Sequence, residues 1–214
     1  MPTEVQCLCA RFAAGGGVQS GVIVHSELLL DYLKRTYPAL YFVSSTTKVL
    51  TEFPRLLQEL QREEFRYVVP DFRLNKAFSE LDALPQTLKD KVEFLCNECC
   101  WVGCTDRKRC YENVSRKNLG EPCPDHRCAA PKAAEGYRFS KAMASPSFIG
   151  VEDIRDCYLP MGFSQFKIEG RGLAAPDLGV SAPLSDQTGI PAPRPGGCLS
   201  GQHARSVLSG RLLL

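Results

Sequence analysis

The chain has 214 residues, of which 44% are hydrophobic, and its formal net charge is +2 at pH 7. This length and apolar content suit one α/β domain with its own core, and the near-neutral charge argues against binding nucleic acid through a broad basic field. Residues 1–17 lack the pattern of a secretory signal, and no run of about 18–20 apolar residues predicts a membrane span. We therefore expect a cytoplasmic protein whose eleven cysteines are thiols or metal ligands rather than disulfides.

Short runs of apolar and β-branched residues recur at intervals of about 20–26 residues along the first half of the chain. The runs are Val22–His25, Tyr41–Ser44, Tyr67–Pro70 and Val92–Leu95. Segments with helical periodicity lie between them, at Glu27–Tyr37, Lys48–Glu63 and Lys76–Lys89. The alternation predicts parallel strands joined by right-handed helical crossovers. Ser26 is the expected N-cap of the first helix, and Thr46 or Thr47 that of the second.

A fifth strand is expected at Phe166–Glu169, after a helix-like segment at Val151–Leu159 and a turn at Pro160–Gly162. A complete (β/α)₈ barrel typically takes about 250 residues, more than this pattern covers. The sequence therefore predicts part of a TIM-like (β/α) barrel of parallel strands over residues 21–173, with a smaller doubly wound sheet as the alternative.

The two ends of the chain lack this periodicity. Residues 1–20 include Gly15–Gly17, and residues 174–214 are rich in Pro, Gly and Ser and contain no aromatic residue. Such a composition buries too little apolar surface to offset the entropy of ordering the chain, so we expect an irregular N-terminal segment and a disordered tail. A truncated or frame-altered gene that lost the beginning and the last helix of a barrel would also give such ends.

A cysteine-rich insertion, residues 96–128, follows the fourth expected strand. Its cysteines are Cys96, Cys99, Cys100, Cys104, Cys110, Cys123 and Cys128. Because functional residues of parallel α/β folds gather at the carboxyl ends of the strands, we expect a loop over the mouth of the barrel. Thiolates are soft ligands for iron–sulfur clusters and zinc, although the spacing matches neither a ferredoxin run nor a zinc ribbon. Thiols without metal, and a nucleophilic cysteine with His126 as its base, are the remaining alternatives.

Other residues of the insertion have two interpretations each. Arg107–Arg109 form a basic run that is either a solvated loop or a counter-charge that steers an acidic or nucleic-acid substrate. Trp101 either anchors the loop or offers a stacking surface. The sequence contains no His-Glu-x-x-His motif and no Ser/His/Asp arrangement that would identify a hydrolase.

Two segments resemble the peptidase U-32 family of collagenase-like peptidases. Gly162–Arg171 contains Lys-Ile-Glu-Gly-Arg, which is similar to the family's late-barrel signature, and Val92–Cys104 resembles its passage from a strand into Asn-Glu and Cys-x3-Cys. The resemblance covers roughly residues 21–173. It implies a TIM-like barrel in which four cysteines hold a [4Fe-4S] cluster. Several members of the family support hydroxylation of ubiquinone precursors or ribosomal RNA, and the family name implies peptidase activity.

Carried over residue by residue, the resemblance implies cluster ligation by Cys100, Cys104, Cys110 and Cys128, with Cys96, Cys99 and Cys123 as alternates. Glu169 and Arg171 match the late motif and are the candidate catalytic residues. We expect a redox or modification function, served by an electron donor and by a second subunit or second copy that completes the barrel. The alternatives are a zinc-stabilised binding or scaffold module, a metal-dependent peptidase and an inactive fragment.

Overall fold

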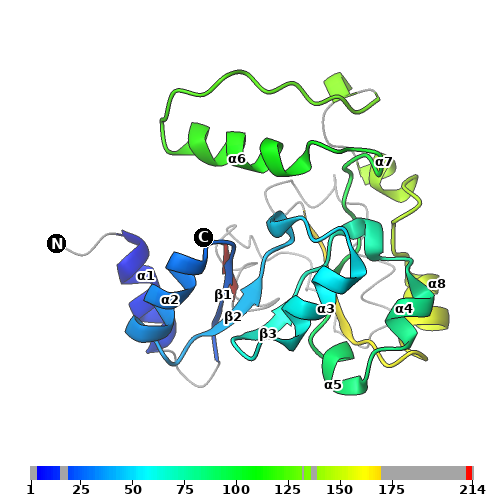
Figure 1. The fold of residues 1–214 in the computed structure, drawn as a ribbon, viewed down its shortest axis with the longest axis horizontal. Helices are drawn as coiled ribbons and strands as arrows, with labels where there is room; N and C mark the ends of the chain where they lie inside the picture. The colour runs from blue at the N-terminus through cyan, green and yellow to red at the C-terminus, as the bar shows by residue number, and fades with distance from the viewer. Residues whose placement is uncertain (1–3, 15–18, 132, 136–138, 170–210, 214) are drawn as a thin grey trace, which may run out of the picture.

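The computed structural model describes residues 4–14, 19–131, 133–135, 139–169 and 211–213, which form a mixed α/β fold (Figure 1). Its strands are β1 (Gly21–Val24), β2 (Tyr41–Ser44), β3 (Phe65–Val68), β4 (Glu93–Leu95), β5 (Gln165–Lys167) and β6 (Arg211–Leu213). All pairings between these strands are parallel. One sheet has the order β3-β2-β1-β6, and β4 pairs with β5. A parallel bridge between Val68 and Val92 links β3 to the residue before β4, so β1 to β5 follow one another in chain order.

The helices of the described residues are short. They are α1 (Glu4–Ala13), α2 (Glu27–Thr36), α3 (Phe53–Gln61), α4 (Phe78–Asp82), α5 (Gln86–Lys89), α6 (Arg107–Asn118), α7 (Phe139–Met143) and α8 (Val151–Asp153). Single turns of 3₁₀-helix are η1 (Thr46–Lys48), η2 (Phe72–Leu74) and η3 (Ala133–Glu135), and a π-helical turn, η4 (Ile154–Tyr158), continues α8. None of the helices in the described ranges has the length and apolar character needed to cross a bilayer.

Helices α2 and α3 cover the same face of the strands. Ser26 is the N-cap of α2, and its hydroxyl accepts a hydrogen bond from the backbone N–H of Leu29. This bond satisfies one of the backbone donors that the first turn of a helix leaves unpaired. The two helices bury four leucines in one hydrophobic cluster, Leu30, Leu33, Leu56 and Leu60. The strands contribute Val22, Val24, Phe42, Val68 and Phe94 to this cluster. Because both helices pack on one face, the chain winds in a single direction from β1 to β3.

The opposite face of the strands carries a second, smaller cluster. Successive side chains of a strand point to opposite faces, so residues adjacent to those of the first cluster meet here. The cluster consists of Ile23, Val43, Val69 and Leu95, with Tyr41 and Tyr67 packed against it. Each of the four buried residues comes from a different strand or its carboxyl end. This layer of branched side chains fixes the register of neighbouring strands.

An aromatic group packs β4 and β5 against the segment that precedes β5. The ring of Phe94 lies 4.8 Å from that of Tyr158, 5.1 Å from that of Phe163 and 6.0 Å from that of Phe166, measured between centroids. Phe94, Tyr158 and Phe163 are fully buried. The hydroxyl of Tyr158 donates to the carbonyl oxygen of Asn75 at 2.5 Å, which ties η4 to the chain after β3. The same group therefore joins the two sheets into one body.

The expected strands are present, and β2 has the predicted bounds. The predicted second helix begins later than Lys48: Thr46–Lys48 form η1, and α3 begins at Phe53 with a proline in its first turn. The prediction that Thr46 or Thr47 caps α3 is wrong, because Glu52 precedes α3 and makes no capping hydrogen bond through its side chain. The predicted helix Lys76–Lys89 is divided into α4 and α5, because Pro85 cannot continue a helix.

Three expectations about the ends and the insertion need correction or lie outside the described residues. Residues 4–13 form α1 rather than an irregular segment. The predicted tail, residues 174–214, falls outside the described residues except for Arg211–Leu213, which form β6 beside β1. The cysteine-rich insertion is not a loop throughout, because it contains the three-turn helix α6, which lies apart from the helices that flank the strands (Figure 1).

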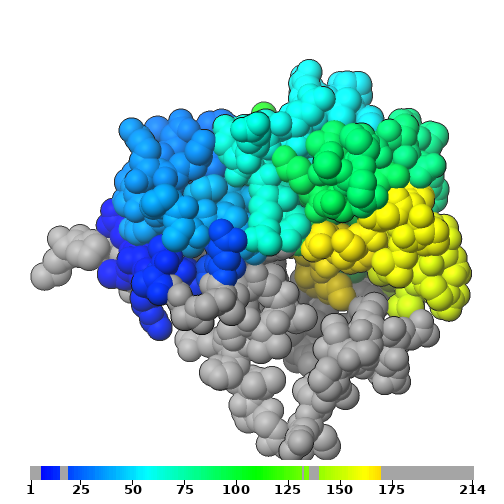
Figure 2. Space-filling model, turned by 90° about the horizontal axis from the view of Figure 1, so that it is seen from below, coloured from blue at the N-terminus to red at the C-terminus, as the bar shows by residue number. Residues whose placement is uncertain are grey.

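The parallel strands and intervening helices agree with the α/β prediction at this coarse level, and the described residues form no closed barrel. The space-filling view from below shows the same order in space, from the N-terminal residues in blue through cyan and green to residues up to 169 in yellow (Figure 2).

Candidate functional site

Polar side chains meet at the carboxyl ends of β3, β4 and β5. Asp71 and Arg73 follow β3, Asn97 and Glu98 follow β4, and Glu169 follows β5. Because parallel strands end at one edge of a sheet, these residues are brought together by topology alone. Asp71, Asn97 and Glu98 are buried, which is costly for a polar group without hydrogen bonds and more so for an unpaired carboxylate.

Arg107 pairs with the two buried carboxylates. Its guanidinium donates to Asp71 Oδ2 at 2.9 Å and to Glu98 Oε2, and it also donates to the hydroxyl of Tyr111. The Arg107 side chain is 1% exposed and lies over the ring of Phe72, 4.6 Å from its centroid. The carboxylates and Tyr111 raise the pKa of Arg107 against the effect of burial, so the guanidinium stays charged. The first residue of α6 thus attaches that helix to β3 and β4.

Arg73 holds the cysteine-containing loop. Its Nε donates to the carbonyl oxygen of Val102 at 2.9 Å, and Nη2 donates to that of Cys104. The other amino group, Nη1, donates to Asp71 Oδ1 at 3.1 Å. Asp71 therefore lies between two arginines and orients both. Arg73 thus holds the loop from Trp101 to Thr105 through the carbonyl groups of Val102 and Cys104.

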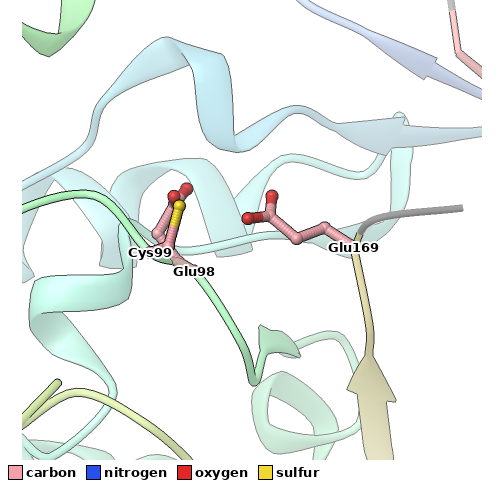
Figure 3. Close-up of side chains that lie close together, drawn as sticks. All are labelled: Glu98, Cys99 and Glu169. Atoms are coloured by element: carbon pink, nitrogen blue, oxygen red, sulfur yellow. The ribbon is translucent and has the colours of Figure 1, made fainter. Parts of the chain in front are cut away.

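Asn97 joins β4 to the chain after β5. Its amide accepts the N–H of Glu169 at 2.8 Å and donates to the carbonyl oxygen of Glu169 at 3.1 Å. This pair brings the Glu169 carboxyl towards Glu98 and Cys99, as Figure 3 shows. The potential ligand atoms of Glu98, Cys99 and Glu169 all lie within 4.8 Å of one another, close enough to hold one metal ion.

Burial and the nearby Glu98 carboxylate raise the pKa of Glu169 to about 7, although Arg107 acts in the opposite direction. Two carboxylates this close resist simultaneous ionisation. The Glu98 carboxylate is held by Arg107 and by the N–H of Cys100 at 2.9 Å. Glu169 is therefore about half-protonated at neutral pH, which gives this edge of the sheet a group able to donate or accept a proton.

The pH dependence of the unfolding free energy should show whether Glu169 takes up this proton. A carboxyl whose pKa rises from 4.5 to about 7 on folding stabilises the fold below pH 4.5, and this stabilisation is lost as pH rises through 7. Between pH 5 and pH 8 we expect the wild type to lose roughly 2–3 kcal/mol more unfolding free energy than Glu169→Gln. Urea denaturation of both proteins at several pH values, without added divalent metal, measures this difference. Parallel pH profiles for the two proteins would contradict the assignment of the proton to Glu169.

Neighbouring thiols act on the pKa of two cysteines in the insertion, Cys100 and Cys110. Burial and the thiols of Cys128 and Cys104 raise the pKa of Cys110. Burial and Glu98 raise the pKa of Cys100 to about 12, with smaller effects of Cys104 and Cys99. Arg107 lowers the pKa of both Cys100 and Cys110, so its charge acts on two of these thiols. The ligand set that the resemblance implies is Cys100, Cys104, Cys110 and Cys128.

The three alternates have different surroundings, although Cys99 also acts on the pKa of Cys100. Cys96 is buried in the main hydrophobic cluster, and burial raises its pKa to about 12. Cys99 belongs to the group with Glu98 and Glu169. The thiol of Cys123 lies 3.6 Å from Asn113 Oδ1 of α6. Cys110 is part of α6 rather than of a loop.

Several features of the site lay beyond the sequence analysis. Nothing in the sequence distinguishes Arg107 from Lys108 and Arg109. In the structure, however, Arg107 is buried and the other two are exposed. The ionic contacts of Asp71 and Arg73 were also missed, although a polar run directly after a strand was the available signal. Arg171 lies outside the described residues. His126 Nδ1 lies 3.5 Å from Asp106 Oδ2 rather than paired with a cysteine.

Comparisons of this chain with known proteins give no family assignment. No protein-family model matches the sequence, no curated protein matches it, and no solved structure matches it. The resemblance to the U-32 family therefore stands on the motifs of the sequence alone.

Proposed function

We propose that this chain is a U-32-like protein with part of a TIM-like barrel, and that it binds a [4Fe-4S] cluster in support of a redox or modification reaction. The proposal rests on the cysteine motif of the sequence and is supported by the thiols of Cys104 and Cys128, which act on the pKa of Cys110, and by that of Cys104, which acts on the pKa of Cys100. The chain-order succession of parallel strands, with α2 and α3 on one face, favours a barrel-like winding over a doubly wound sheet.

The thiols fit such a group chemically. Partly buried thiols near one another ionise poorly in isolation, and a cationic cluster offsets this by binding them as thiolates and releasing their protons. A bound iron–sulfur cluster would supply one-electron chemistry at the carboxyl ends of the strands. The residues of the chain have separate tasks: Arg73 fixes the loop that carries Cys104, Arg107 provides a buried positive charge, and Glu169 can take up or release a proton near neutral pH.

Metal analysis tests the proposal. Protein purified without oxygen should show a broad visible band and about four irons per chain with matching sulfide. We expect Cys104→Ser to lose most of this iron and to melt at a lower temperature, because three thiolates hold the cluster poorly. Cys7→Ser is the matched control, since Cys7 is an exposed thiol on α1, and its iron content should equal that of the wild type.

The same measurement distinguishes the alternatives. A colourless protein with about one zinc per chain would favour the zinc-stabilised scaffold or the metal-dependent peptidase. Equal metal content in Cys104→Ser and the wild type would remove Cys104 from the ligand set. Protein without iron or zinc would contradict the proposal.

A further inference from the structure

A cavity of about 470 Å³ opens beside the cysteine-containing loop. It is lined by Val49, Thr51, Arg73, Val102, Gly103, Cys104, Thr105, Arg107 and Lys108. One wall follows β2 and η1, and another is η2, which follows β3, so the cavity lies beyond the carboxyl ends of two parallel strands. Its volume falls within the range of small-molecule sites, and it lies at the edge of the sheet where parallel α/β folds bind ligands.

The lining of this cavity is basic. Three of its residues are cationic, Arg73, Arg107 and Lys108, and none carries a carboxylate. Asp71 and Glu98, which pair with the arginines, do not line the cavity. A second cavity, of about 360 Å³ at the amino ends of β2 and β3, differs in this respect, because lysine and arginine there are accompanied by Glu63 and Glu64.

Lys108 is the cation that remains available to a ligand. It is exposed in the first turn of α6, and it forms no ion pair within the part of the chain that the structure describes. Its neighbour Arg109 points elsewhere and lies 3.7 Å from the Asp106 carboxylate. Arg73 and Arg107 are held in place by their carboxylates and backbone acceptors, so they contribute charge at fixed positions. Thr51 and Thr105 also line the cavity, and a threonine hydroxyl can donate a hydrogen bond to an anion.

The backbone at the cavity has an unusual conformation. Val49 has φ 54° and ψ 55°, in the left-handed region that a β-branched residue rarely adopts. Its N–H donates to the carbonyl oxygen of Thr46 at 3.0 Å, which holds the turn after η1 in this conformation. Local strain of this kind persists where the surrounding structure imposes it, and it concentrates at ligand sites. The wall formed by Val49 and Thr51 is therefore shaped by the fold rather than by local preference.

We propose that this cavity binds an oxyanion, the phosphate or carboxylate group of a small molecule, with Lys108 as its principal mobile contact. Ammonium and guanidinium groups form charge-assisted hydrogen bonds with both kinds of anion. Anion binding in this cavity does not depend on the proposed iron–sulfur cluster, because Cys104 lines the cavity whether or not its thiol binds iron. An anion held here lies next to that thiol, where a substrate of the proposed reaction would have to be placed.

The single tryptophan of the chain gives a direct readout. Trp101 packs against Gly103, at which an added Cβ would lie 2.5 Å from the indole ring, and Gly103 lines the cavity. We would titrate the full chain with inorganic phosphate, and separately with malonate, at constant ionic strength. Tryptophan fluorescence would be recorded with calorimetry as a second measure. The iron and zinc content of every sample would be determined, so that loss of the cluster and loss of anion binding are seen separately.

A saturable response is expected for at least one of the two anions, and the stronger one identifies the chemical class. Lys108→Gln should weaken its binding about tenfold, whereas Arg109→Gln, with the same charge change on the same helix turn, should change it less than twofold. Thr51→Val should weaken binding without changing the net charge. Absence of saturation in both fluorescence and heat, or equal losses in Lys108→Gln and Arg109→Gln, would overturn the proposal.

Discussion

Replacing Arg107 with methionine should lower the unfolding free energy by about 3–5 kcal/mol, because the change leaves two buried carboxylates without their counter-charge. Asp71 is fully buried and Glu98 nearly so, and each is paired with the Arg107 guanidinium. Methionine retains most of the apolar length of the side chain, so the loss reports the charge rather than a cavity. Urea denaturation at pH 7, monitored by circular dichroism, measures the difference.

The control for this substitution lies two residues away. Arg109 is also in the first turn of α6, but its side chain is 72% exposed, and its ion pair with Asp106 is at the surface. Exposed pairs of this kind contribute about 0–1 kcal/mol, so Arg109→Met should leave stability nearly unchanged. If Arg107→Met lost less than about 1 kcal/mol, the network around Asp71 would not be what attaches α6 to the strands.

Phe94→Ala should have a comparable effect for an apolar reason. Removing a fully buried phenyl ring typically costs about 3–5 kcal/mol, through lost burial and the cavity that remains. Phe94 contacts the rings of Tyr158, Phe163 and Phe166, so the substitution also weakens the packing of β4 and β5 against η4. Thermal and urea denaturation measure the loss.

Phe12→Ala provides the comparison for Phe94→Ala. Phe12 lies on α1 and is 36% exposed, so its removal should cost well under half as much. Equal losses for the two variants would mean that the aromatic group around Phe94 is not the core that unites the two sheets.

The strands could be predicted because their signal is local. Val22–Val24 and Tyr41–Ser44 are apolar on both faces, as strands buried between two layers must be, and both runs form strands. Helix boundaries were less accurate. The apolar residues of Lys76–Lys89 keep a helical spacing across Pro85, but the helical backbone cannot continue through a proline. Helix α1 was missed although its apolar residues Val5, Leu8, Cys9 and Phe12 have the spacing of one helix face.

The site was predictable in place but not in its contacts. The carboxyl ends of the strands contained the polar residues that meet there, including Glu98 and Glu169. The orientation of α6 was not encoded in any short motif, because it depends on the distant Asp71. The burial of Arg107 and the exposure of Lys108, one residue further along, follow from that orientation. The basic run therefore contains one structural cation, Arg107, and one cation that faces a cavity, Lys108.

The chain-order arrangement of the strands has a consequence for the order of folding during synthesis. Gly21 pairs with Tyr41 and Val43 with Tyr67, whereas Glu93 pairs with Gln165 across a much longer stretch of chain. Closing the longer loop costs about 1 kcal/mol more, and its partner strand is made later. At roughly 5–20 residues per second, the chain from Cys128 to Lys167 takes roughly 2–8 s to synthesise. Throughout that interval the thiols have emerged but Asn97 has no Glu169 to bind, so the proposed metal ligands are open to oxidation before β5 docks.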